Sequence, residues 1–188
     1  MRSIAGDRRR ASSAQRRGFT LIEVMISTIF ISVALLAAVG TLGTSLRMSR
    51  TVNEREVAQR AAAAVIQEIA ATEFSKVLAS YDADPSNDPS GAGTAPGASF
   101  AVAGLSPQKG AAATSVGRVL FPLVGAELRE DFVSKDLGTP HDLNGDGVID
   151  ALNHRNDCTL LPVRVEIRWQ GVDGNASSLS MTRLLCPR

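Results

Sequence analysis

Residues 142–153 place oxygen-bearing side chains at alternate positions of a short polar segment. These side chains belong to Asp142, Asn144, Asp146 and Asp150. A hard divalent cation takes six to eight oxygen ligands, and alternate residues of a tight loop point toward its centre. Val148 would add its carbonyl oxygen, and Gly147 permits the sharp turn that such a loop needs. The spacing therefore predicts a calcium site.

The same segment resembles the first nine positions of an EF-hand-type or dockerin-type calcium loop. It departs from that pattern at the twelfth position, where Asn153 stands in place of the usual bidentate Glu or Asp. A single neutral oxygen from Asn153 would weaken the site, unless Asp157 folds back to compensate. We expect an affinity in the micromolar to millimolar range. The alternative is a run of Asx turns that binds no metal.

No arrangement typical of an enzyme accompanies this loop. His141 and His154 flank it, but their spacing fits no common zinc motif, so we expect both at the surface. The sequence contains no Gly-x-Ser-x-Gly elbow, no phosphate-binding loop and no Cys–His pair in an electropositive setting. We therefore predict a protein that is not an enzyme.

Two cysteines, Cys158 and Cys186, lie at the outer ends of two predicted strands. Apolar and polar residues alternate over 160–169, and a second strand is predicted at 177–186 after a turn. A hairpin centred on Val172 would place the two thiols directly opposite each other, within disulfide reach. Such a bond would contribute about 3–4 kcal/mol in the chain-entropy model. Two free thiols are the alternative.

An apolar stretch at residues 16–46 must position the rest of the chain. It begins with the basic pair Arg16 and Arg17, carries one acid, Glu23, and has no charged residue from Val24 to Leu46. As a helix, those last residues span roughly 34 Å, enough to cross a hydrocarbon core of about 30 Å. Glu23 needs a partner, because a carboxylate near the end of a membrane span is costly.

Residues 16–24, which read RRGFTLIEV, resemble the cleavage and methylation signal of type IV prepilins and type II secretion pseudopilins. The resemblance implies that a prepilin peptidase cuts between Gly18 and Phe19, and that the new amino group of Phe19 is methylated. It also implies that Glu23 pairs with the terminal amine of a neighbouring subunit during assembly. The alternative is an ordinary signal anchor whose Glu23 lies at the level of the lipid headgroups.

The predicted leader, residues 1–18, determines the charge of the chain. It holds six of the 20 basic and one of the 19 acidic residues, so cleavage would leave 14 basic and 18 acidic residues, a net charge of −4. A mildly acidic chain argues against a nucleic-acid partner. The arginines of the leader favour a cytoplasmic N-terminus. We expect a single-pass protein of the bacterial inner membrane with a periplasmic C-terminal domain.

Residues 19–46 are predicted to form a transmembrane and assembly helix, which continues as an amphipathic helix over 47–80. In the second segment, apolar residues recur at three- and four-residue spacing opposite a charged face. The two segments together predict one helix from about Phe19 to Ala79. Its second half should pack on a sheet.

Residues 81–99, with two Asp-Pro pairs and several glycines, are predicted as a loop. Residues 100–188 are predicted as a small exported β-rich domain. Before the hairpin, we expect short strands at 100–104 and 118–124 and one helical turn at 127–132. The fold class is therefore α+β, with a long helix packed on a small antiparallel sheet, as in pilins.

The resemblance implies a structural subunit, a minor pilin or minor pseudopilin of a type IV pilus or a type II secretion filament. Its partners would be the prepilin peptidase, other pilin or pseudopilin subunits, and an inner-membrane assembly platform. The sequence does not separate the pilus from the secretion system. The alternative is a calcium-dependent tip adhesin or binding module mounted on a pilin-like stalk.

Overall fold

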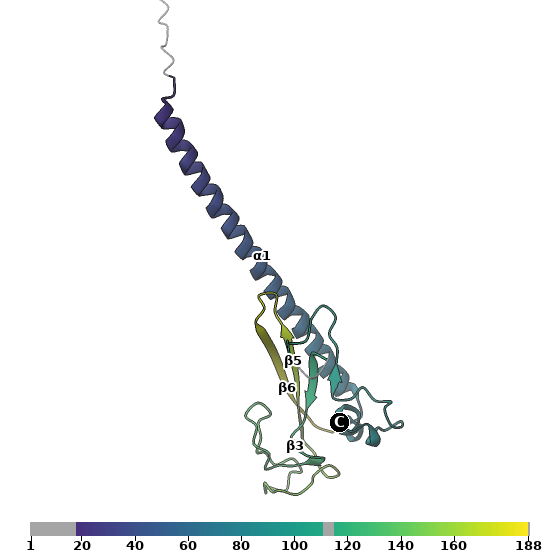
Figure 1. Cartoon of the computed structure of the whole chain (residues 1–188). Coiled ribbons are helices and arrows are strands. Elements are labelled where there is room, and N and C mark those ends of the chain that lie inside the picture. Colours follow the sequence, from purple (N-terminus) through teal and green to yellow (C-terminus); the bar gives the residue numbers. More distant parts are fainter. Residues whose placement is uncertain (1–17, 111–114, 188) are drawn as a thin grey trace, which may run out of the picture. The chain divides into compact units, whose positions relative to one another are not determined.

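The computed structural model describes residues 18–110 and 115–187 and confirms the α+β class (Figure 1). Its elements are, in chain order, α1 (Leu21–Ala71), α2 (Phe74–Tyr81), a 3₁₀ turn (Pro85–Asn87), β1 (Ser99–Phe100), β2 (Gly117–Leu120), β3 (Leu123–Val124), β4 (Glu127–Leu128), β5 (Leu161–Gln170) and β6 (Ala176–Leu185). The chain divides within α1 into two compact units, one ending at Ser45 and the other beginning at Leu46. The predicted leader lies outside the described residues, except for Gly18.

The second unit is built on an antiparallel sheet of order β1-β2-β5-β6, beside a separate β3–β4 pair. β5 and β6 pair along their whole length, from Leu161↔Leu185 to Gln170↔Ala176. The alternation predicted for β5 is confirmed on its inner face. Every second residue of the strand is at most 1% exposed there, namely Leu161, Val163, Val165, Ile167 and Trp169.

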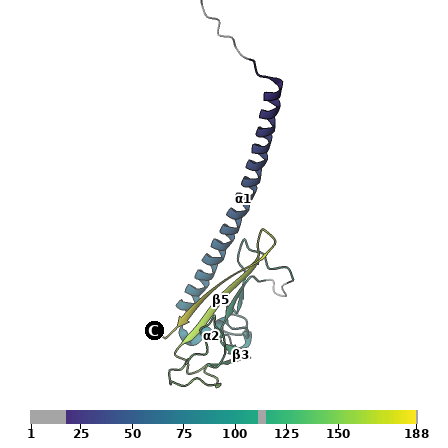
Figure 2. The same cartoon turned by 90° about the vertical axis from the view of Figure 1, so that its left-hand side faces the viewer.

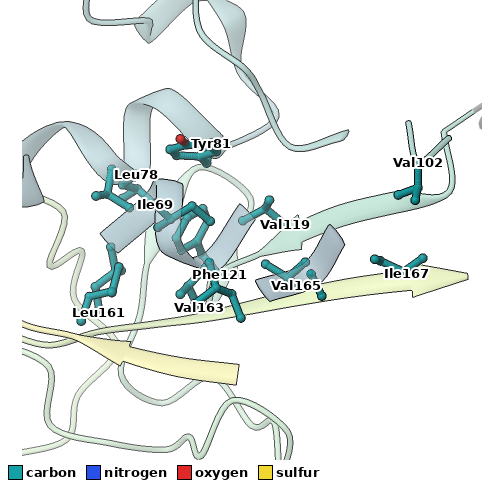
Figure 3. Close-up of a cluster of buried hydrophobic side chains, with 14 of the residues drawn as sticks. Ile69, Leu78, Tyr81, Val102, Val119, Phe121, Leu161, Val163, Val165 and Ile167 are labelled. Carbon is teal, nitrogen blue, oxygen red and sulfur yellow. The ribbon is translucent and has the colours of Figure 1, made fainter. Parts of the chain in front are cut away.

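The C-terminal half of α1 runs beside this sheet (Figure 2). Its buried stripe consists of Ala58, Ala62, Ile66 and Ile69. Figure 3 shows Ile69 among side chains from α2, β2 and β5, including Leu78, Val119 and Val163. Near the other end of the stripe, the indole Nε1 of Trp169 donates a hydrogen bond to Glu54 Oε2 at 3.3 Å. The amphipathic helix therefore packs on the sheet as its spacing predicts.

The prediction of one helix to Ala79 is wrong, because α1 ends at Ala71. Both the backbone N–H and the hydroxyl of Thr72 bond to the carbonyl of Glu68, at 3.1 and 3.0 Å. Glu73 then turns out of the helix with ψ 129°. The phenol of Tyr81, at the end of α2, bonds to Glu68 Oε1 at 3.2 Å. No Gly or Pro marks the break in the sequence. The break lets α2 direct its own apolar face into the core.

The outer face of β5 is not solvated as predicted. Glu166 is 7% exposed and lies between Arg164 and Arg168, whose guanidinium nitrogens are 3.5 and 3.0 Å from its Oε1. Arg164 also pairs with Asp136, in the long connection between β4 and β5. The hydroxyl of Thr182 on β6 donates to the carbonyl of Asp136 at 2.8 Å. This connection covers part of the outer face.

The short elements before the hairpin also differ from their predictions. The strand expected at 118–124 is divided into β2 and β3 by Phe121 and Pro122, since proline has no N–H to continue the ladder. The helical turn expected at 127–132 is β4 instead, joined to β3 through a turn in which Gly125 has φ +65°. Of the strand expected at 100–104, only Phe100 lies in a strand, at the end of β1.

Truncating the helix stripe tests this packing. Ile69 is 0% exposed, so we expect Ile69→Ala to lower the free energy of unfolding by about 2–5 kcal/mol. Denaturant unfolding of the detergent-solubilised chain measures this, followed by the fluorescence of Trp169, its single tryptophan. Val172→Ala in the exposed hairpin turn is the control and should cost less than about 0.5 kcal/mol. Equal effects of both substitutions would contradict the packing.

Candidate functional site

The first candidate site is the N-terminal part of α1. Every residue from Gly18 to Arg50 is exposed. Large apolar side chains are spread around this segment, among them Leu21, Ile22, Ile29, Phe30, Ile31, Val33, Leu35, Leu36, Val39 and Leu42. The helix is long and apolar enough to cross a membrane. An apolar surface of this extent is typical of a segment that lipid or protein covers.

Several hydroxyl groups within this segment donate hydrogen bonds to backbone carbonyls of the helix itself. Thr28 Oγ1 donates to the carbonyl of Val24, Ser32 Oγ to that of Thr28, and Thr41 Oγ1 to that of Ala38, each at 2.8 Å. These polar groups therefore need no water, which suits a helix in a hydrocarbon environment.

Glu23 lies in the first turn of α1, and its backbone N–H bonds to Thr20 Oγ1 at 3.3 Å. A carboxylate is favoured there by the dipole of the helix. In the part of the chain that the structure describes, no basic side chain lies within 4.0 Å of it. Gly18 and Phe19 precede the first helical residue, and Phe19 is 81% exposed. The predicted scissile bond therefore lies outside the helix.

The second candidate site is the loop predicted to bind calcium. Asp142 accepts the N–H groups of Gly145 and Gly147 at 2.6 and 2.8 Å, which hold the pKa of its carboxyl below the usual range. Asn144 and Asp146 each accept the N–H two residues ahead, at 3.0 and 2.8 Å. The first half of the loop is thus a series of Asx turns.

The last two predicted ligands have other partners. Asn153 Oδ1 accepts the N–H groups of Leu128 on β4 and of Arg155, at 3.1 and 3.2 Å. Asp150 Oδ1 accepts the N–H of Leu152 at 2.7 Å and lies 3.0 Å from the Nε2 of His154. Of the six predicted ligands, only the four at residues 142–148 belong to these turns. Asp150 and Asn153 bond to other groups instead.

A cluster that we call the Glu130 cluster lies beneath the loop and consists of Glu130, Asp150 and His154. One ligand atom from each lies within 4.8 Å of the other two. β4 and its continuation position Glu130, while residues 150–154 run alongside, with the N–H of His154 bonded to the carbonyl of Leu128 at 2.8 Å. Only Asp150 belongs to the predicted ligand set.

Glu130 is 0% exposed and organises the loop from below. Its Oε1 accepts the N–H groups of Leu143 and Asn144 at 2.7 and 3.1 Å, and its Oε2 accepts that of Asp150 at 3.3 Å. Leu143 is itself fully buried in the core. Each of these N–H groups would cost roughly 1–3 kcal/mol if it were left without an acceptor. Sequence reasoning missed Glu130, because it predicted only a helical turn at 127–132 and gave this carboxylate no partner.

The expectation of a surface histidine is wrong for His154, which is 3% exposed, while His141 is exposed. The Nδ1 of His154 lies 3.3 Å from Asp157 Oδ2, and its Nε2 faces Asp150. The hydrogen bond with Asp150 raises the pKa of the imidazole, against the opposing effect of burial, and the bond with Asp157 adds to the rise. The same contact lowers the pKa of Asp150.

Arg155 attaches the end of the loop to the helical part of the second unit. Its two terminal nitrogens donate to the carboxylate of Asp82, just after α2, and to the carbonyl of Ala126, each at 2.7 Å. Asp82 is 6% exposed, so this is a largely buried ion pair. Breaking such a pair by removing one partner typically costs about 3–5 kcal/mol.

The two cysteines are free thiols in the structure. The hairpin is centred on Asp173 rather than Val172, since Gly171 and Asn175 close a five-residue turn with Gly174 at φ +81°. This register continues to Cys186 opposite residue 160, two positions from Cys158. The prediction that the two cysteines lie directly opposite each other is therefore wrong, and the disulfide stays a prediction.

Mass spectrometry of the chain isolated without reductant tests the disulfide. If the bond forms, the intact mass rises by two hydrogen atoms on reduction, and neither thiol is alkylated beforehand. If the thiols are free, we expect exposed Cys186 to be alkylated faster than Cys158, since partial burial raises the pKa of the Cys158 thiol. An equal rate at both thiols would contradict the structural placement.

The structure thus brings the side chains of Glu130, Asp150 and His154 together. It leaves the predicted processing residues, Gly18 and Phe19, exposed just before α1. Comparisons of the chain with protein-family models, with curated proteins and with solved structures gave no match. Residues 1–17, which hold most of the predicted leader, lie outside the described residues.

Proposed function

We propose that this chain is a structural subunit of a membrane-derived filament, a minor pilin or minor pseudopilin. One observation carries the proposal: the sequence GFTLIE, at residues 18–23, leads directly into an apolar helix whose whole circumference is exposed. In the membrane, lipid would cover that surface. In a filament, the same helices of neighbouring subunits would cover it instead.

Glu23 gives this assembly its register. Its carboxylate stands at the start of an apolar segment, where an unpaired charge is costly. After cleavage by a prepilin peptidase, the methylated amino group of Phe19 in a neighbouring subunit would supply the opposite charge. Such a pair acts as a specificity device rather than as a large source of stability. An assembly platform in the inner membrane would transfer subunits from lipid to filament.

Replacing the carboxylate tests the register role. We expect Glu23→Ala to insert into the membrane normally but to be lost from filaments. Leaving the partner amine uncompensated costs about 3–5 kcal/mol, which corresponds to about 100-fold or more in incorporation. The measurement compares the amounts of the subunit in purified filaments and in membranes.

Glu56→Ala is the matched control, because Glu56 is an exposed acid of the same helix paired with Arg60. It should enter filaments as the unmodified chain does. Normal incorporation of Glu23→Ala would refute the register role, and failure of both variants would indicate a general defect of α1.

The loop at residues 142–148 favours a second role, calcium binding, either within the filament subunit or as part of a tip adhesin. The Asx turns of Asp142, Asn144 and Asp146, with Gly147 at φ +85°, suit a loop that directs oxygens to a central cation. The fit is partial, because Asp150 and Asn153 have other partners. Three side chains and the Val148 carbonyl would bind calcium with help from water.

Calorimetry of the detergent-solubilised chain tests this site. With so few protein ligands, we expect a dissociation constant of about 10⁻⁴–10⁻³ M for Ca²⁺. Asp146→Asn should abolish the binding heat, while Asp173→Asn, in the exposed hairpin turn, should not change it. Absence of binding heat in the unmodified chain would show that the loop is only a series of turns.

A further inference from the structure

The Glu130 cluster differs from the calcium-type loop in the chemistry of its ligand atoms. It offers one imidazole nitrogen, the Nε2 of His154, together with the carboxylates of Glu130 and Asp150. Nε2 lies 3.0 Å from Asp150 Oδ1 and 3.9 Å from Glu130 Oε2. Imidazole with carboxylates suits zinc and related transition metals, whereas calcium takes oxygen ligands only.

These separations match the size of a small metal ion. Ligands about 2.0–2.1 Å from a tetrahedral zinc ion lie roughly 3.3 Å from one another. The separations of His154 Nε2 from Asp150 Oδ1 and from Glu130 Oε2, 3.0 and 3.9 Å, lie on either side of that value. Among the described residues, Glu130 Oε2 and Asp150 Oδ1 each accept one backbone N–H group, so each of these two oxygens keeps a lone pair for a metal.

Asp157 supplies the support that a metal-binding histidine requires. Its Oδ2 lies 3.3 Å from the Nδ1 of His154, on the side of the ring away from Glu130 and Asp150. A carboxylate in this position holds the proton on Nδ1 and leaves the Nε2 lone pair directed at the metal. Asp157 is not one of the three proposed ligands, so its contact with His154 adds to the distances among those ligands.

The charge balance of the cluster also calls for a cation. Glu130 is fully buried, and among residues 18–110 and 115–187 no Lys or Arg nitrogen lies within 4.0 Å of its carboxylate. Three carboxylates, those of Glu130, Asp150 and Asp157, face one imidazole, and that of Glu130 is fully buried. Buried charges in proteins are paired or coordinate metals.

We propose that Glu130, Asp150 and His154 bind a divalent transition metal of the zinc class, with Asp157 as the residue that positions the imidazole. Three protein ligands leave a coordination position for water. The metal would join the segment that follows β4 to the far end of the loop and so fix residues 142–157 against that segment. This site is independent of filament assembly and shares only Asp150 with the predicted calcium ligands.

The test uses the full chain in detergent, freed of metal with a chelator and titrated with Co²⁺ and then with Zn²⁺. We expect one equivalent of Co²⁺ to give visible ligand-field absorption without a thiolate charge-transfer band. One equivalent of Zn²⁺ should remove that absorption. His154→Gln should weaken binding by about 100-fold or more and Asp157→Asn by about 10–100-fold.

His141→Gln is the matched control, because His141 is an exposed histidine at the other end of the same loop. It should leave Co²⁺ binding unchanged, as should Asp146→Asn, which removes a ligand of the calcium-type loop only. Trp169 emission and circular dichroism establish that each variant is folded. The stoichiometry of the unmodified chain provides a test that depends on no variant.

Three outcomes would overturn the proposal. The first is a folded, unmodified chain that takes up no Co²⁺ or Zn²⁺ at equimolar concentration. The second is binding that persists in folded His154→Gln. The third is a thiolate charge-transfer band that disappears in Cys158→Ser or Cys186→Ser, since the metal would then be held by the cysteines.

Discussion

The second unit depends on the close approach of α1 to β5. Ala58 and Ala62 are both fully buried, and side chains this small let the helix backbone come near the sheet. Ile66 and Ile69 then fill the space toward α2 and β2. Side chains from β4, β6 and the loops, among them Leu128, Leu143 and Leu185, complete this core.

The long connection between β4 and β5 has almost no β-ladder hydrogen bonds, apart from a single bridge between Ser134 and Thr139. A chain without a ladder must still satisfy its buried backbone N–H groups. Glu130 accepts three of them, while Asn153 Oδ1 accepts the N–H of Leu128 at the edge of β4. Buried side-chain oxygens thus replace regular strand pairing. This explains why the carboxylate of Glu130 lies in the interior.

The same helix, α1, has to suit two surroundings. Its first half is apolar on all sides and provides backbone acceptors for several of its own hydroxyl groups, while its second half is apolar along one stripe only. Glu54 is at the transition, where it accepts the indole hydrogen bond of Trp169. Glu54 and Glu23, two acids of the same helix, therefore have different roles. Glu54 accepts a hydrogen bond within the chain, whereas Glu23 has no basic partner within 4.0 Å among the described residues.

Local period and composition were enough to predict three features: the helical stripe, the inner face of β5 and the apolar N-terminal helix. Features that depend on distant partners emerged only in the tertiary structure. Packing against the core ended α1 at Ala71, and a five-residue turn set the hairpin register two positions away from a Cys158–Cys186 pairing. Glu130 was buried as well. Local spacing cannot reveal its partners, because the groups that face Glu130, from Leu143 to His154, lie 13 to 24 residues further along the chain.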